Sequence, residues 1–151
     1  MGYFADIYVI KKTRSRKLAN EFINHFLPKN EECTECYELP QFGKETVLEF
    51  SDVNKLMDYL EMNSNETYKI YWKNLDDKSL NCFGMLFYTS DGCIIFGISR
   101  DTFISDNTNN EDNCLEEMKA FLDTDKGYIC YESMPEMTYK EFVNTVNRLQ
   151  T

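Results

Sequence analysis

The chain has 151 residues, of which 42% are hydrophobic and 15% aromatic, and its formal net charge at pH 7 is −10. This apolar content excludes a disordered chain, and the length suits a single domain, 1–151, with its own core. The negative charge disfavours DNA and anionic membranes and favours basic partners. No segment approaches the roughly 20 apolar residues of a membrane span, and no export signal is recognised. The six cysteines are therefore expected to be free thiols in a reducing cytoplasm.

The first half of the chain predicts two helices and three strands. Aromatic and β-branched residues indicate a strand over 3–10. Apolar residues four apart then indicate a helix that Thr13 or Ser15 caps and that Pro28 ends. No element is predicted in the polar stretch 29–44. The next predicted elements are a strand over 46–50, a helix capped by Ser51 and a strand over 67–73.

The second half predicts a hairpin at the centre of a sheet. Two apolar runs, 80–88 and 93–99, flank a Thr-Ser-Asp-Gly turn over 89–92, and glycine accepts the positive φ that such a turn needs. Both runs are apolar nearly throughout, so both of their faces are expected to be covered. The remaining predicted elements are a helix around 114–122, a strand over 127–132 and a helix opened by the capping box Thr138-x-x-Glu141. The expected fold is α+β, a single mixed β-sheet of five or six strands with about four helices against it.

The chain offers few reactive groups. Cys33 and Cys36 form a CxxC pair, which in other proteins holds half of a zinc site or acts as a redox dithiol. No second CxxC exists, and acidic residues on both sides raise the thiol pKa, so incidental loop cysteines are the preferred interpretation. His25, the only histidine, lies in the middle of a predicted helix beside its apolar stripe, as packing or surface histidines do. We therefore expect no cofactor, no metal and no catalytic residue, and an enzyme of unrecognised type stays an alternative.

A basic segment lies at the start of the first predicted helix. Residues 1–30 carry six positive and two negative side chains, although the whole chain is acidic. Cations are unfavourable at a helix N-terminus, so either the protein's own acids lie nearby or an anion binds there. The second interpretation is a small regulatory module that binds an anion, a nucleotide or RNA. Its candidate residues are Lys11, Lys12, Arg14, Arg16 and Lys17.

An acidic cluster surrounds the start of the third predicted helix. Acids are favoured at a helix N-terminus, so the cluster has a purely structural explanation. It is also a candidate surface for a basic protein partner, because dense charge speeds association. Aromatic residues of the strand over 67–73 are further interface candidates, although packing beneath the helices is the preferred interpretation. The partner-binding candidates are Asp101, Asp106, Glu111, Asp112, Glu116, Glu117, Tyr71 and Trp72.

Four short stretches resemble a known class of proteins. They are Tyr-Phe-Ala-Asp at 3–6, Asn-His-Phe-Leu-Pro at 24–28, Tyr-Trp-Lys-Asn at 71–74 and Phe-Tyr-Thr-Ser-Asp-Gly at 87–92. In order and size the chain resembles the small acidic immunity proteins of bacterial polymorphic-toxin systems. The resemblance implies one-to-one binding to a basic toxin domain, often a nuclease, and inhibition of that domain. It contains no diagnostic motif, and no site residue carries over from it.

Overall fold

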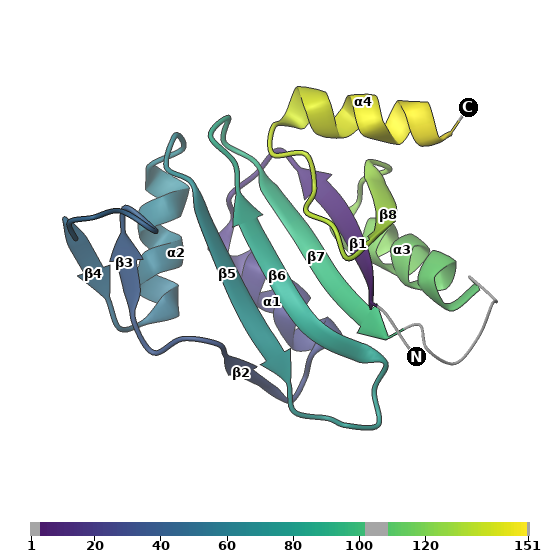
Figure 1. The fold of residues 1–151 in the computed structure, drawn as a ribbon, viewed down its shortest axis with the longest axis horizontal. Coiled ribbons are helices and arrows are strands. Elements are labelled where there is room, and N and C mark those ends of the chain that lie inside the picture. The colour runs from purple at the N-terminus through teal and green to yellow at the C-terminus, as the bar shows by residue number, and fades with distance from the viewer. Residues whose placement is uncertain (1–3, 102–108, 151) are drawn as a thin grey trace.

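The computed structural model describes residues 4–101 and 109–150. Within them the chain forms the α+β fold expected from the sequence, with four helices, a six-stranded sheet and a separate two-stranded sheet (Figure 1). The strands are β1 (Phe4–Lys11), β2 (Asn30–Glu32), β3 (Tyr37–Leu39), β4 (Leu48–Phe50), β5 (Tyr68–Asn74), β6 (Asn81–Tyr88), β7 (Ile94–Asp101) and β8 (Gly127–Tyr131). The helices are α1 (Arg16–Phe26), α2 (Val53–Met62), α3 (Asn109–Leu122) and α4 (Tyr139–Leu149).

The larger sheet has the order β2-β5-β6-β7-β1-β8. The predicted hairpin strands β6 and β7 therefore lie at its centre, and Gly92 in their turn has the expected positive φ of 88°. All strand pairs of the described residues are antiparallel. The sheet is thus antiparallel throughout the described residues, and β4 pairs with β3 in the smaller sheet rather than joining it.

Polar side chains cap the N-termini of α1, α2 and α4. Ser15 caps α1 and Thr138 caps α4, as the sequence predicts, and each side chain accepts a hydrogen bond from a backbone N–H two or three residues into the helix. The cap of α2 is Asp52 rather than the predicted Ser51, because the Asp52 carboxylate accepts from the backbone of Asn54. A one-residue shift of a cap leaves the inward face of the helix unchanged.

The larger sheet separates two hydrophobic clusters. Helices α1, α2 and α3 cover one face, where Phe22 of α1 meets Phe96 of β7 with ring centroids 5.0 Å apart. Helix α4 packs against the other face, where Phe142 meets Tyr128 of β8 at 4.7 Å. Because β6 and β7 contribute side chains to both clusters, these strands are buried on both faces, as their apolar runs predict.

A buried carboxylate holds the connection between β8 and α4 against the sheet. Asp6 of β1 is 9% exposed, accepts a hydrogen bond from the backbone N–H of Ser133 at 3.1 Å and is hydrogen-bonded to the Ser99 side chain. The hydroxyl of Tyr8 donates to the carbonyl oxygen of the same Ser133 at 2.9 Å. Burial raises the pKa of Asp6 above its ordinary value.

The raised pKa of Asp6 predicts a specific pH dependence of stability. The native state keeps the proton of Asp6 at a pH where the unfolded chain has already lost it, so ionisation of Asp6 destabilises the fold as the pH rises. Asp6→Asn removes this ionisation. We therefore expect the free energy of unfolding of Asp6→Asn, relative to the unmutated protein, to increase between about pH 4 and pH 7. Urea unfolding at several pH values measures the difference, and a decrease over that interval would contradict the assignment.

Candidate functional site

A pocket of the described residues lies at the β5 edge of the larger sheet. Strand β2 pairs with β5 only from Trp72 to Asn74, and the last backbone hydrogen bond at this edge joins Cys33 N–H to the carbonyl oxygen of Tyr71. After Cys33 the chain turns away into β3, which belongs to the smaller sheet. The edge of β5 before Tyr71 therefore has no neighbouring strand.

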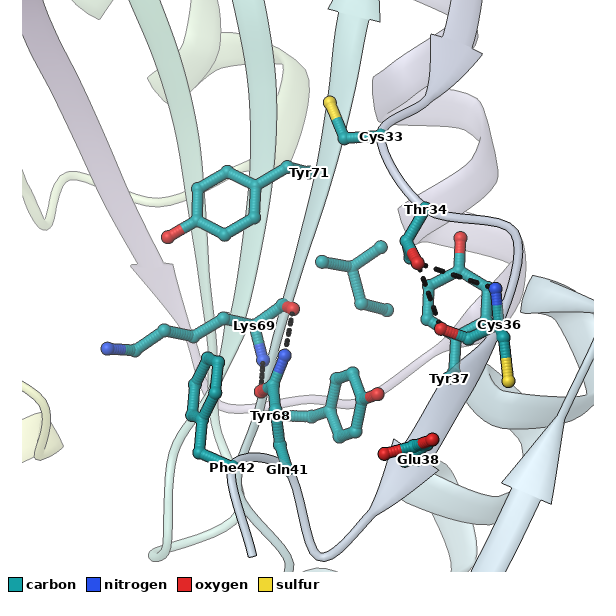
Figure 2. Close-up of a pocket in the computed structure, with 11 residues that line it drawn as sticks. Cys33, Thr34, Cys36, Tyr37, Glu38, Gln41, Phe42, Tyr68, Lys69 and Tyr71 are labelled. Carbon is teal, nitrogen blue, oxygen red and sulfur yellow. Dashed lines mark hydrogen bonds between the residues drawn. The ribbon is translucent and has the colours of Figure 1, made fainter.

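A side chain occupies this edge in place of a strand. The Gln41 Oε1 atom accepts a hydrogen bond from the backbone N–H of Lys69 at 2.7 Å, and Gln41 Nε2 donates to the carbonyl oxygen of Lys69 at 2.9 Å (Figure 2). The Gln41 amide thus makes both of the hydrogen bonds that a peptide group of a neighbouring strand would make. These two bonds attach the 40–47 loop to the larger sheet.

The pocket beside Gln41 has a volume of about 520 Å³ and joins an apolar wall to an acidic rim. Its wall includes the rings of Tyr37, Tyr68 and Tyr71, and Glu38 lies at its rim (Figure 2). In Figure 2 the Lys69 side chain extends away from Glu38, and its Nζ lies 5.8 Å from the centroid of the Phe87 ring. The Glu38 side of the pocket is therefore negatively charged and lined by aromatic rings.

The two cysteines of the CxxC pair do not act together. Both are free, and their sulfur atoms point in opposite directions in Figure 2. The Cys36 thiol donates a hydrogen bond to Glu49 Oε1 at 2.9 Å, which raises the pKa of Cys36 to about 11. Burial, followed by the charge of Glu31, raises the pKa of Cys33. The predicted loss of thiol reactivity is confirmed in direction, since a protonated thiol is a poor nucleophile and a poor metal ligand.

One group of potential metal ligands lies next to the pocket. The ligand atoms of Cys36, Glu38 and Glu49 lie within 4.8 Å of one another, and no other such group of three occurs in residues 4–101 and 109–150. Cys36 is half-buried, whereas both carboxylates are exposed, and a structural zinc site takes four ligands rather than three. The thiol already has a hydrogen-bond acceptor in Glu49. The arrangement is accounted for by that hydrogen bond.

The segment around the pocket carries a concentrated negative charge. We name residues 31–49 the acidic lobe, which contains six glutamates and one lysine and so accounts for −5 of the net charge of −10. All six glutamates are exposed. The four ion pairs of the described residues lie elsewhere on the protein. The charge of the lobe is therefore not neutralised by ion pairs within the described chain. Its glutamates are Glu31, Glu32, Glu35, Glu38, Glu45 and Glu49.

The acidic lobe also exposes large apolar side chains. Phe42 is 86% exposed and Val47 is 77% exposed, and Phe42 lines the pocket mouth. Phe42 adopts a positive φ of 63°, a backbone conformation that is uncommon for a residue with a side chain. An exposed aromatic residue surrounded by charge is a common feature of protein interfaces, where aromatic side chains contribute much of the binding energy.

The five residues of the basic segment before α1 lie in different surroundings, and two of them, Lys11 and Lys12, line a pocket of about 270 Å³. The guanidinium of Arg14 is buried and donates to four backbone carbonyls. Arg16 pairs with Asp58 at 3.0 Å. Lys11 Nζ donates to the carbonyl oxygen of Leu122 at the end of α3, where the negative end of the helix dipole attracts a cation. The other two residues are Lys12, whose Nζ lies 4.3 Å from the Tyr139 ring centroid, and the exposed Lys17.

The acids around α3 do not form one exposed surface either. Glu111 is only 5% exposed, because it lies three residues before Cys114 on the face of α3 that turns toward the sheet. Glu116 and Glu117 are exposed, and each has a cationic or imidazole neighbour. Asp101 at the end of β7 is half-buried, Asp112 is exposed, and Asp106 lies outside the described residues.

The structure places the other three sequence-based candidates in different surroundings. Trp72 is 4% exposed in the main core, so it is not available to a partner. Tyr71, on the opposite face of β5, lines the pocket and is half-buried. His25 stacks on Phe121 at 4.7 Å and its Nε2 lies 3.1 Å from Glu117 Oε1. His25 thus has the contacts of a packing or surface residue.

Comparison with protein-family models, curated protein sequences and solved structures finds no match to this chain. Similarity therefore supplies no function, and the resemblance to immunity proteins stays a prediction. Among the described residues, none of the helices combines the length and the apolar character of a membrane span.

Sequence reasoning did not single out the acidic lobe, although a signal for its exposed aromatic residue was present. The stretch Pro40-Gln-Phe-Gly43 places an aromatic residue between two residues typical of turns. An apolar side chain in such a turn has few neighbours to bury it, and glutamates dominate the flanking sequence. Together these features indicate an exposed aromatic residue within a negative field.

Proposed function

We propose that this chain is a non-catalytic cytoplasmic binding protein of the immunity type, which inhibits a basic enzyme domain such as a toxin nuclease by binding it through the acidic lobe. The observation that carries the proposal is Phe42, 86% exposed at the mouth of a pocket, in a lobe that carries six exposed glutamates. The apolar group offers an anchor for a partner, and the negative field attracts a basic surface.

The chemistry of the described residues supports binding over catalysis. The pocket holds tyrosines, and burial raises the pKa of Tyr68 to about 12 and that of Tyr71 above its ordinary value. The thiol of Cys36 has a pKa of about 11. Groups that stay protonated at neutral pH are weak bases and weak nucleophiles, whereas they donate hydrogen bonds well. The free state of all six cysteines fits the proposed reducing compartment.

The test is a titration of the purified chain into the enzyme domain encoded by the neighbouring reading frame, with that enzyme's own activity as the readout. We expect stoichiometric inhibition that weakens as the salt concentration rises. The triple reversal Glu35→Lys, Glu38→Lys and Glu45→Lys is expected to raise the Kd roughly 100-fold, because it replaces attraction by repulsion on the binding surface.

A matched reversal on another acidic surface serves as the control. Glu116→Lys and Glu117→Lys on α3 change the charge by +4, against +6 for the triple reversal, at positions far from Phe42 in sequence. We expect the Kd to change less than about threefold. An equal loss of affinity in this control would place the binding surface elsewhere. Absence of inhibition, or turnover of a substrate by the purified chain, would reject the proposed function.

A further inference from the structure

The exposed edge of β5 is closed by a side chain rather than by a strand. Edge strands invite pairing with another chain, and proteins commonly block them with charges, bulges or covering segments. Here the block is the Gln41 amide, which takes both the N–H and the carbonyl oxygen of Lys69. Gln41 is only partly buried and belongs to a loop whose next residue is the exposed Phe42. Two hydrogen bonds of one flexible side chain are a weaker closure than a paired strand.

We infer that this edge is the place where the partner binds: an extended, basic segment of the partner displaces the Gln41 amide and pairs its backbone with Lys69 as an added strand of the larger sheet. The inference rests on the proposed function and names the element that is recognised. Strand addition supplies affinity through backbone hydrogen bonds, and the pockets beside the edge select the alternate side chains. The 520 Å³ pocket lies along this edge, since Lys69, Ile70 and Tyr71 line it.

Charge complementarity determines the chemistry of the segment. Glu38 lies at the rim of the pocket beside Gln41, and a second pocket shares Cys33, Thr34 and Cys36 with it. The larger neighbouring pocket, about 670 Å³, is lined by Glu31, Glu32 and Glu35 together with Lys73. A strand added at Lys69 would run between these carboxylates and the tyrosine wall. Successive side chains of a strand point to opposite faces, so a segment that alternates basic and apolar residues fits both surfaces.

The probe is a ten-residue peptide that alternates arginine with valine, blocked at both ends. We expect it to bind the full chain, measured by calorimetry, and to shift the NMR signals of the Lys69 backbone amide and the Gln41 side-chain amide. The same peptide with every backbone amide N-methylated keeps its charge but has no backbone N–H to donate, so it cannot pair as a strand. We expect it to bind at least about tenfold more weakly, from the loss of the backbone hydrogen bonds to Lys69.

Gln41→Ala removes the group that competes with the peptide. We expect this variant to bind the arginine–valine peptide about fivefold more tightly. The reason is that the peptide no longer has to break the two weak hydrogen bonds between Gln41 and Lys69. Hydrogen exchange at the Lys69 amide should be faster than in the unmutated protein and should slow again when the peptide binds. The comparison of the two peptides uses the unmutated chain, so it stays informative even if Gln41→Ala is unstable.

The outcomes separate this inference from the proposed function. Equal binding of the methylated and unmethylated peptides, or an unmoved Gln41 side-chain signal on binding, would overturn strand addition. If the reversal of Glu35, Glu38 and Glu45 abolishes inhibition of the enzyme domain while Gln41→Ala changes nothing, the acidic lobe binds the partner by charge alone. Peptide pairing at Lys69 without any inhibition of the enzyme domain would reject the proposed function and leave the edge as a peptide site.

Discussion

Replacing Arg14 by alanine is expected to lower the free energy of unfolding by about 3–5 kcal/mol. Arg14 is 5% exposed, and its guanidinium joins the end of α2 to the turn between β6 and β7. Without it, buried carbonyl oxygens lose a charged donor, and water does not reach them easily. Nη1 donates to Leu60 at 2.7 Å and Asn63 at 2.8 Å, and Nη2 donates to Glu66 at 2.7 Å and to Thr89.

Two further variants test this assignment of Arg14. Arg14→Lys keeps the charge but loses the planar fork that reaches several carbonyls at once, so an intermediate loss of stability is expected. Arg16→Ala, two residues away, removes an exposed pair with Asp58 and is expected to cost less than about 1 kcal/mol. Urea unfolding measures all three variants. A similar loss for Arg14→Ala and Arg16→Ala would show that the buried carbonyl contacts contribute little.

Phe22→Ala is expected to destabilise the fold by about 3–5 kcal/mol. Phe22 is fully buried on α1 and contacts three other rings, so its truncation leaves a cavity where α1, α3 and β7 meet. The helices and the sheet pack closely around this cluster, so neither can move in to fill the cavity without losing other contacts. The neighbouring rings are Phe26 at 4.9 Å, Phe96 at 5.0 Å and Phe121 at 6.3 Å between centroids.

Phe42→Ala is the matched control for Phe22→Ala. Phe42 is 86% exposed, so its removal is expected to change the free energy of unfolding by less than about 0.5 kcal/mol. Both variants are measured by urea unfolding with fluorescence detection of the buried Trp72. If Phe42→Ala destabilises the protein as much as Phe22→Ala, Phe42 stabilises the fold and is not a free anchor for a partner.

Elements whose signals lie within a few neighbouring residues were predicted correctly. The Asp91-Gly92 turn, the capping side chains of α1 and α4 and the long apolar strands around the hairpin depend on local backbone conformation and side-chain spacing. Strands β2 and β3 were missed, because three-residue segments rich in glutamate have neither a strand composition nor a detectable period. The hydrogen bonds that make them strands come from β5, which lies far along the chain from β2, and from β4, which follows β3 after the 40–47 loop.

The candidate site was predicted less well, because burial depends on long-range packing. The sequence predicted that Arg14 and Glu111 are surface charges. In the structure Arg14 is buried against the end of α2, and Glu111 is buried on the inward face of α3. Trp72 was an interface candidate from the sequence, but the structure places it in the core. Phe42 was not a candidate, but its side chain is exposed. Local spacing specifies which backbone conformation a residue adopts and which neighbours share its face. Whether that face meets water or another element is settled when segments distant in the chain come together, as Gln41 and Lys69 do at the edge of β5.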